Sequence, residues 1–318
     1  MRVLHVLEGM YYGGSETHVL TNCLAAKFAE HSIYSLVPNP GDDNDFSVFF
    51  LEHNIPIYYN DFDLIRKDFD IVHFYSGFQH DIIKNGIDKY KPAVWTMTFN
   101  TSAYKTKCPV LCTSFQTLLN QLPENESYLY RCAVDIENFN PKYKTVHDGI
   151  NLIRICATGK SELLLDQVVA DLLNVYSDVN YYVIQDTSGV VHDRIHYLGR
   201  QKDIKPYLFN ADLFVYAPKQ PSACTCDICI IEPMACGIPV VATKDWQVTE
   251  QISHGDTGIF VEHEYESMKR GIEYFLRNRD QLSIFGINAR RRAEELFDIN
   301  KRMTLLKYLY EKEIEKSK

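Results

Sequence analysis

Short apolar runs alternate with helix-length segments along this chain, and no other feature limits its fold as much. The first run is Val3–Leu7, and an apolar stripe at helical spacing follows it after Gly13-Gly14. We predict that this first helix begins at Ser15, a residue type that caps helix N-termini well. Further strand candidates lie at residues 32–37, 55–58, 71–75, 94–98 and 110–113. Short buried strands separated by helices indicate a parallel sheet with helices on both faces.

The alternation stops over residues 131–151 and then begins again. This stretch is rich in Asn, Asp, Lys and Pro without an apolar period, so we predict a linker there. Strands are expected again at residues 152–157, 181–184, 195–198, 213–217, 239–242 and 258–261, and the chain is predicted to be helical from about 265 to 318. At 318 residues the chain is about twice the usual domain length. These observations predict two doubly wound α/β domains facing each other across a cleft, with ligands at the carboxyl ends of the strands.

Charge and composition exclude several classes of protein. The chain has 33 Lys and Arg against 42 Asp and Glu, a net charge of −9, and both halves are acidic, so we expect no nucleic-acid partner. Arg290-Arg291-Arg292 are predicted to lie on a solvated helix face. No run approaches the roughly 18 apolar residues of a membrane-spanning helix, and Met1 leads directly into a strand-like run without an apolar leader. With an odd count of nine cysteines, the chain is expected to be a cytoplasmic protein.

A series of motifs follows in order along nearly the whole chain. They are Gly13-Gly14-Ser15-Glu16-Thr17-His18, Asp70-Ile71-Val72-His73, Val134-Asp135 with Phe139-Asn140-Pro141, Tyr197-Leu198-Gly199-Arg200, and Ile231-Glu232-Pro233-Met234-Ala235-Cys236-Gly237. In this order they resemble the motifs of GT-B fold glycosyltransferases of family four (glycosyl transferases group 1), of which the chain looks like a divergent member. The resemblance implies two Rossmann-like domains, an acceptor-side domain over residues 1–145 and a nucleotide-sugar donor domain over 150–300. It also implies that a C-terminal helix, residues 301–318, crosses back to the first domain.

The resemblance also implies an activity. Members of this family move a sugar from a nucleotide-diphosphate sugar to a hydroxyl acceptor with retention of configuration and without a bound metal. The donor, of the UDP or GDP type, is a substrate, so no cofactor is expected. Carbohydrate or lipid-linked acceptors are implied as partners, and a lipid-linked acceptor would place the protein peripherally at a membrane.

Two glycines, a lysine and a glutamate are the main candidates for holding the donor. Gly13 and Gly14 let the backbone approach a ligand, and the helix after them directs N–H groups at an anion, although a plain tight turn is the alternative. Lys160 stands where the resemblance places an Arg on the donor diphosphate, and it would act as a point charge. The resemblance assigns Glu232 to the ribose hydroxyls. Its alternative role is to stabilise the first turn of its helix.

Four further positions take their roles from the same resemblance. Gly199 and Arg200 lie where the nucleobase edge is usually met. Asp227 and Ile228 lie where backbone amides of the family meet the phosphates.

Among the departures from the family pattern, two provide candidate catalytic residues. Cys224 stands in place of a Glu that contacts the donor sugar, and Asn100 stands in place of a His. An Asn can hydrogen-bond a sugar or phosphate but cannot take up a proton at neutral pH. Asn100, Lys160 and Cys224 are therefore the candidate catalytic residues, and the alternative function is a nucleotide-sugar-binding or partner subunit that has lost transfer.

Two other patterns offer metal ligands. The cluster Cys224-x-Cys226-x-x-Cys229 resembles a soft-metal ligand set, but structural zinc sites usually take widely separated Cys pairs, so buried or ligand-lining thiols are the favoured interpretation. Asp61-Phe62-Asp63 and Asp68-Phe69-Asp70 each match the Asp-x-Asp pattern of the other large glycosyltransferase fold, which holds a divalent cation. The later motifs make that second fold the weaker alternative.

Overall fold

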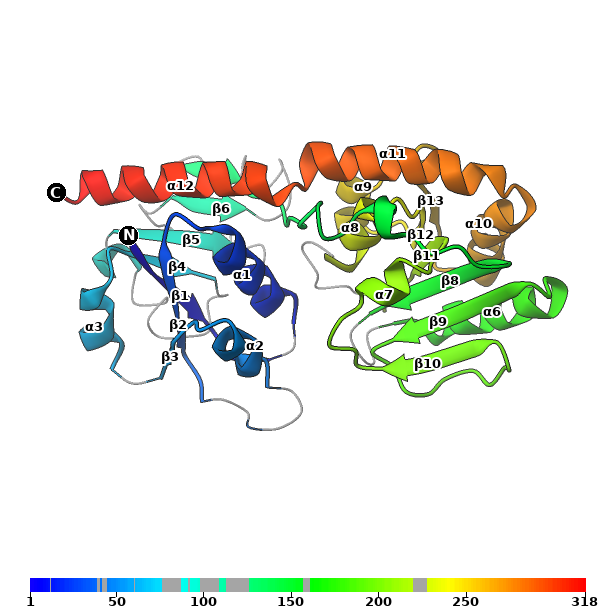
Figure 1. Ribbon diagram of the computed structural model, residues 1–318, viewed down its shortest axis with the longest axis horizontal. Helices are drawn as coiled ribbons and strands as arrows, with labels where there is room; N and C mark the ends of the chain where they lie inside the picture. Colours follow the sequence, from blue (N-terminus) through cyan, green and yellow to red (C-terminus); the bar gives the residue numbers. More distant parts are fainter. Residues whose placement is uncertain are drawn as a thin grey trace. The chain divides into compact units, whose positions relative to one another are not determined.

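The computed structural model forms two compact units, each built on its own sheet (Figure 1). It describes residues 1–11, 13–38, 41, 45–59, 61–75, 87–90, 92–97, 109–112, 126–156, 161–219 and 228–318. The first unit comprises Met1–Ala133 and Ile299–Lys318, and the second comprises Val134–Asp298. Every described strand pair in both sheets is parallel, so the predicted fold class of two doubly wound α/β domains is confirmed.

The described sheet of the first unit has the order β3-β2-β1-β4-β5-β6-β7. Its strands are β1 (Arg2–Leu7), β2 (Glu30–Ser35), β3 (Ile57–Tyr58), β4 (Ile71–Phe74), β5 (Ala93–Met97), β6 (Val110–Cys112) and β7 (Ser127–Leu129). The apolar runs of the sequence predicted β1 to β6. They did not predict β7, because a three-residue strand with only half-buried side chains has no apolar pattern of its own.

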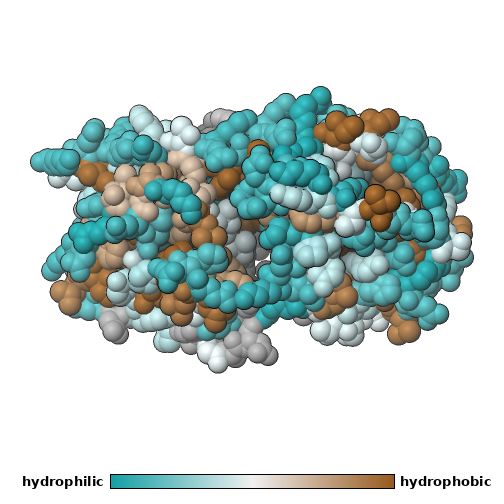
Figure 2. All heavy atoms as spheres, in the orientation of Figure 1, coloured by the Kyte–Doolittle hydropathy of each residue, from teal (hydrophilic) through white to brown (hydrophobic). Residues whose placement is uncertain are grey.

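Helices from both ends of the chain cover this sheet. They are α1 (Gly14–Ala25), α2 (Ser47–Glu52), α3 (Phe62–Ile65) and α12 (Ile299–Lys316), with two short 3-10 helices, η1 (Arg66–Asp68) and η2 (Ile87–Tyr90). The last helix, α12, lies against α1, β4 and β5, and it buries Met303, Leu306 and Leu309 in one core with Val3 and Ile71. Hydrophilic residues predominate along its outer side (Figure 2).

The predicted N-cap of α1, Ser15, is wrong by two residues. The N-cap is Gly13, whose extended backbone (φ −153°, ψ 170°) precedes the first helical residue, Gly14. No side chain caps this end through the N-cap residue, because a glycine has none to offer.

The described sheet of the second unit has the order β10-β9-β8-β11-β12-β13. Its strands are β8 (Ile150–Ile155), β9 (Val179–Ile184), β10 (Ile195–Gly199), β11 (Leu213–Tyr216), β12 (Val240–Thr243) and β13 (Gly258–Val261). Its helices are α6 (Leu163–Val175), α7 (Lys205–Leu208), α8 (Ile228–Ala235), α9 (Trp246–Gln251), α10 (Tyr265–Arg277) and α11 (Asp280–Leu296). A 3-10 helix, η3 (Pro141–Tyr143), lies in the segment before β8.

Helix α11 fixes the position of α8. A Cβ added to Gly286 of α11 would lie 2.3 Å from the carbonyl oxygen of Gly237, so only glycine allows this close approach. Arg290 of α11 donates to the carbonyl of Ala235, the last residue of α8, at 2.7 Å. Arg292 donates to the carbonyl of Gln251 at 2.7 Å. The prediction that this arginine run lies on a solvated face is therefore wrong for Arg290 and Arg292.

No helix of the described residues is both long and apolar enough to cross a membrane.

Candidate functional site

In the second unit, a tight backbone arrangement lies at the carboxyl ends of β9 and β10. The Gly199 N–H donates to the carbonyl of Asp186 at 2.8 Å, and the Gln185 N–H donates to the carbonyl of Gly199 at 2.8 Å. Gly199 has φ +62° and Gln185 has φ +88°, and a Cβ on Gly199 would lie 3.0 Å from Cγ2 of Thr187. Position 199 therefore favours glycine, and the exposed Arg200 follows directly at this edge, where ligands bind in such sheets.

A buried polar network holds this edge in place. The Arg154 guanidinium, 2% exposed, lies 3.2 Å from a carboxylate oxygen of Asp166 and 3.0 Å from one of Asp186. The hydroxyls of Tyr181 and Tyr197 each donate to Asp166 at 2.9 Å. Because these residues come from α6, β8, β9, β10 and the loop after β9, the network ties all five segments together.

Glu232 lies in the middle of α8, which packs against β11 and β12. Ile228 is the first residue of this helix and Glu232 the fifth, so the alternative that Glu232 stabilises the first helical turn is wrong. Pro233 follows it within the helix. The carboxyl group therefore has no local capping role.

Burial raises the pKa of Glu232 to about 8. The ammonium of Lys205, the first residue of α7, lowers it by a smaller amount. No described residue donates a hydrogen bond to this carboxyl group. Burial also raises the pKa of Cys236, one turn further along, to about 12, and the charge of Glu232 adds to that shift. A partly buried carboxyl group without a described donor is suited to accept hydrogen bonds from a ligand's hydroxyls.

Sequence reasoning missed Lys205 as a neighbour of Glu232. Its signal was present, because Lys205 follows Gly199-Arg200 in a short polar loop and opens the next helix. Only the fold brings this loop and α8, which are distant in sequence, close together.

In the first unit, Gly13 and Gly14 lie at the start of α1, at the carboxyl end of β1. The Glu16 side chain lies against them: a Cβ on Gly13 would be 2.7 Å from its Oε2 atom, whereas a Cβ on Gly14 would meet no described atom within 4 Å. Glu16 is 8% exposed, and burial raises the pKa of its carboxyl group to about 7, although the backbone N–H groups of Glu16 and Tyr11 hydrogen-bond to it. An anion at this helix terminus would therefore lie beside a carboxyl group that is partly protonated at neutral pH.

Four of the predicted site residues, Asn100, Lys160, Cys224 and Asp227, lie outside the described residues. The Asp-x-Asp patterns can be judged, because most of their carboxylates have partners in the first unit. Asp61 accepts from the Leu64 N–H at 3.2 Å, Asp63 pairs with Arg66 at 3.3 Å, and Asp70 accepts from the Arg2 N–H at 2.7 Å. These contacts explain Asp61, Asp63 and Asp70 as structural residues.

Comparisons with known proteins point to one family. Residues 189–292, which contain Gly199, Arg200, Ile228 and Glu232, match the family model of glycosyl transferases group 1. The N-acetyl-alpha-D-glucosaminyl L-malate synthase of Bacillus anthracis is 30% identical over 134 residues, which are 42% of this chain and 32% of that protein. The match thus spans about a third of the relative's length.

Solved structures of GT-B glycosyltransferases resemble the whole chain. A glycosyltransferase from Rickettsia africae aligns with a TM-score of 0.79 at 18% identity, over 100% of this chain and 99% of that one. Anabaena HepE, solved with UDP and glucose, aligns with a TM-score of 0.76 at 15% identity, over 97% and 98% of the two chains. At such identities the likeness shows the fold, which is GT-B.

Proposed function

We propose that this chain, a divergent GT-B protein with a glycosyl transferases group 1 domain, transfers a sugar from a nucleotide-diphosphate sugar to a hydroxyl acceptor with retention of configuration. The second unit would hold the donor and the first unit would supply the acceptor side. The observation that carries the proposal is the Glu232 carboxyl group, which lies partly buried within the matched segment and has no described hydrogen-bond donor.

Glu232 is suited to bind the ribose. Burial keeps this carboxyl group mostly protonated at neutral pH in the free protein. Two vicinal ribose hydroxyls would favour the ionised carboxylate, which can accept hydrogen bonds from both, and charge-assisted bonds of this kind are stronger than neutral ones. The nucleobase would lie at Gly199 and Arg200, where the backbone is held by the Asp186 carbonyl. The amides at Asp227 and Ile228 would meet the phosphates.

The chemistry requires stabilisation of charge on the departing diphosphate. Lys160 and the N–H groups after Gly13-Gly14 are the groups proposed to supply it. The diphosphate can itself accept the proton of the acceptor hydroxyl, so Asn100 in place of a histidine would not prevent transfer. Cys224 would lie beside the donor sugar, where it alters sugar recognition. In this scheme no divalent cation takes part.

The donor is proposed to be a uridine diphosphate sugar. HepE was solved with UDP-glucose, and it shares the fold over nearly the whole chain. A carbohydrate or lipid-linked hydroxyl compound is the proposed acceptor.

The test is nucleotide release. Purified protein is mixed with UDP-glucose, UDP-N-acetylglucosamine and GDP-mannose, with and without EDTA, and nucleoside diphosphate is measured. We expect release from a UDP-sugar that EDTA does not suppress, and its loss in Glu232→Gln but not in Glu266→Gln, an exposed glutamate of the same unit. Release that depends on added metal would contradict metal independence, and equal rates in both variants would contradict the role of Glu232.

The alternative is a GT-B subunit that binds a nucleotide sugar without transferring it, which the changes at Asn100 and Cys224 favour. Calorimetry with UDP and GDP separates the two. Binding of UDP without release from any donor would support the subunit. Absence of both binding and release would refute the proposed donor site altogether.

A further inference from the structure

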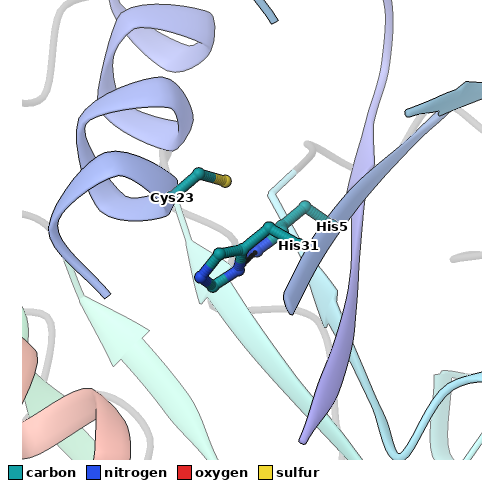
Figure 3. Close-up of side chains that lie close together, drawn as sticks. All are labelled: His5, Cys23 and His31. Atoms are coloured by element: carbon teal, nitrogen blue, oxygen red, sulfur yellow. Dashed lines mark hydrogen bonds between the residues drawn. The ribbon is translucent and has the colours of Figure 1, made fainter. Parts of the chain in front are cut away.

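Three side chains that can bind metals meet inside the first unit, at His5 on β1, Cys23 on α1 and His31 on β2. One ligand atom from each lies within 4.8 Å of the others. Figure 3 shows Cys23 pointing from its helix towards the two imidazole rings. His5 is fully buried, Cys23 is 6% exposed with a free thiol, and His31 is partly exposed, which gives an ion a route to the site. Among the described residues this is the single group of three or more potential metal ligands.

The hydrogen bonds of His31 leave its Nδ1 atom, which faces His5, available to bind an ion. Its Nε2 lies 3.0 Å from the carbonyl oxygen of Ala26, which can only accept, so Nε2 carries the proton. In a neutral ring, Nδ1 then has a free lone pair, and it faces Nε2 of His5 at 2.9 Å. Metal-bound histidines usually donate their other N–H to such a carbonyl.

His5 can also free a lone pair towards the site. Its other nitrogen, Nδ1, lies 3.2 Å from the hydroxyl of Tyr75, which is both a donor and an acceptor. When an ion takes Nε2, the ring proton moves to Nδ1 and is donated to Tyr75. The Tyr75 hydroxyl can then donate to Nδ1 of His73 at 2.8 Å. The surrounding hydrogen bonds thus accommodate both states of His5.

The charges around the group favour a monovalent ion. Among the described residues, the titratable groups whose charge acts on His5 or His31 are His18, His73, Lys27 and the N-terminal ammonium. The phenols of Tyr75, Tyr130 and Tyr310 lie near enough to Cys23 for its charge to act on them, and none of these groups is a carboxylate. The Cys23 thiolate would therefore be the sole anionic ligand. Because a buried net charge costs several kcal/mol, a singly charged ion that leaves the site neutral is preferred over a divalent one.

We propose that His5, Cys23 and His31 bind one soft monovalent metal ion of the Cu(I) class. Thiolate and imidazole ligands suit such an ion. On binding, the Cys23 S–H bond breaks, the proton leaves to water, and sulfur bonds to the ion without a change of oxidation state. Two nitrogens bound to one three-coordinate ion lie roughly 3.5 Å apart, so the rings need to separate by about half an ångström. The site is independent of the proposed transfer reaction.

The test uses full-length protein carrying Cys224→Ser, Cys226→Ser and Cys229→Ser, which removes the competing thiol cluster. This protein is titrated without oxygen with Cu(I) held by a chromogenic chelator, with Ag(I) as a redox-inert substitute and Zn(II) as the divalent comparison. Cys23→Ser and His31→Gln are the test variants, and the Gln amide can keep the bond to Ala26. Cys132→Ser is the matched control, because that buried thiol lies 3.6 Å from Nδ1 of His18 in the same unit.

We expect one equivalent of Cu(I) to bind, roughly 100-fold more weakly in both test variants and unchanged in Cys132→Ser. X-ray absorption should show one sulfur and two nitrogen neighbours. Failure to bind Cu(I), or equal affinity in the test variants, would overturn the site. Tighter binding of Zn(II) than of Cu(I) would overturn the preference for a monovalent ion. His31→Gln keeps the proposal testable if Cys23→Ser does not fold, because position 31 is partly exposed.

Discussion

The guanidinium of Arg302, on the last helix α12, donates a hydrogen bond to the side-chain oxygen of Asn22 on the first helix α1. Arg302 is 6% exposed, and it also donates to the carbonyl of Arg131 at 3.2 Å and lies 5.2 Å from the centre of the Tyr130 ring. Its partners are neutral groups, so the charge is held by carbonyl dipoles and an aromatic face. This contact joins chain segments that are 280 residues apart into one unit.

Arg302→Met should destabilise the first unit by about 3 kcal/mol, because it leaves the Asn22 oxygen buried without its donor. The methionine keeps part of the aliphatic stem, so lost packing contributes less. Urea unfolding followed by hydrogen exchange in α1 and α12 measures the effect. Lys307→Met, on an exposed part of the same helix, should change stability by less than about 0.5 kcal/mol. Equal stability of the two variants would show that the Arg302 contacts carry no net stabilisation.

Gly14→Ala tests whether the turn at Gly13-Gly14 contacts a ligand or has only a structural role. No described atom lies within 4 Å of the new methyl group, and alanine is favoured over glycine by about 0.5–1 kcal/mol in a helix, so the free protein should be slightly more stable. If the turn approaches a ligand, transfer should nevertheless fall about 10-fold or more. Thermal unfolding and donor turnover are measured on the same sample. Full activity together with raised stability would support the tight-turn alternative.

Asp166→Ala tests the buried polar network around Arg154, which holds the sheet edge at Gly199 in place. The substitution leaves the buried Arg154 charge with Asp186 alone and removes the acceptor of two tyrosine hydroxyls, so we expect a loss of about 3–5 kcal/mol. Gln167→Ala, exposed on the same helix, is the control. Tyr197→Phe removes one hydroxyl and should cost about 1 kcal/mol. If chemical denaturation showed all three variants to be alike, the network would not be a stabilising element.

All strands except β7 were predictable because each of them carries a local signal. A short apolar run such as 71–75 or 258–261 identifies a buried strand without any knowledge of its neighbours. Strand ends were less predictable, since a strand stops where its partner stops. The N-cap of α1 was also predicted wrongly. Ser15 has the better side chain for capping, but the backbone enters the helix two residues earlier, at Gly13.

Side-chain partners between distant segments could not be predicted. Arg290 looks like a surface residue in its own helix, but its guanidinium donates hydrogen bonds to the carbonyls of residues 136, 139 and 235. His5 and His31 meet because β1 and β2 are parallel neighbours in the sheet. The apolar pattern of the sequence indicates each strand but not which strands pair. The resemblance predicts Glu232 as a donor-site residue, and this stays a prediction, whereas its raised pKa and its proximity to Lys205 depend on the fold.

Glu232 should make the stability of the free protein depend on pH. Its pKa is about 8 in the folded protein against an ordinary value of 4.5, so between these values the folded state binds an extra proton and loses stability as the pH rises. Glu232→Gln removes this dependence. The variant should therefore resemble the wild type at pH 5 and exceed it at pH 9 by on the order of 3 kcal/mol, in thermal or urea unfolding. Glu266→Gln, exposed on α10, should follow the wild type at both pH values.

At pH 9, saturating UDP should stabilise the wild type more than it stabilises Glu232→Gln, because the ribose hydroxyls would stabilise the Glu232 carboxylate. A wild-type profile parallel to that of Glu232→Gln would show that the carboxyl group is already solvated or paired in the free protein.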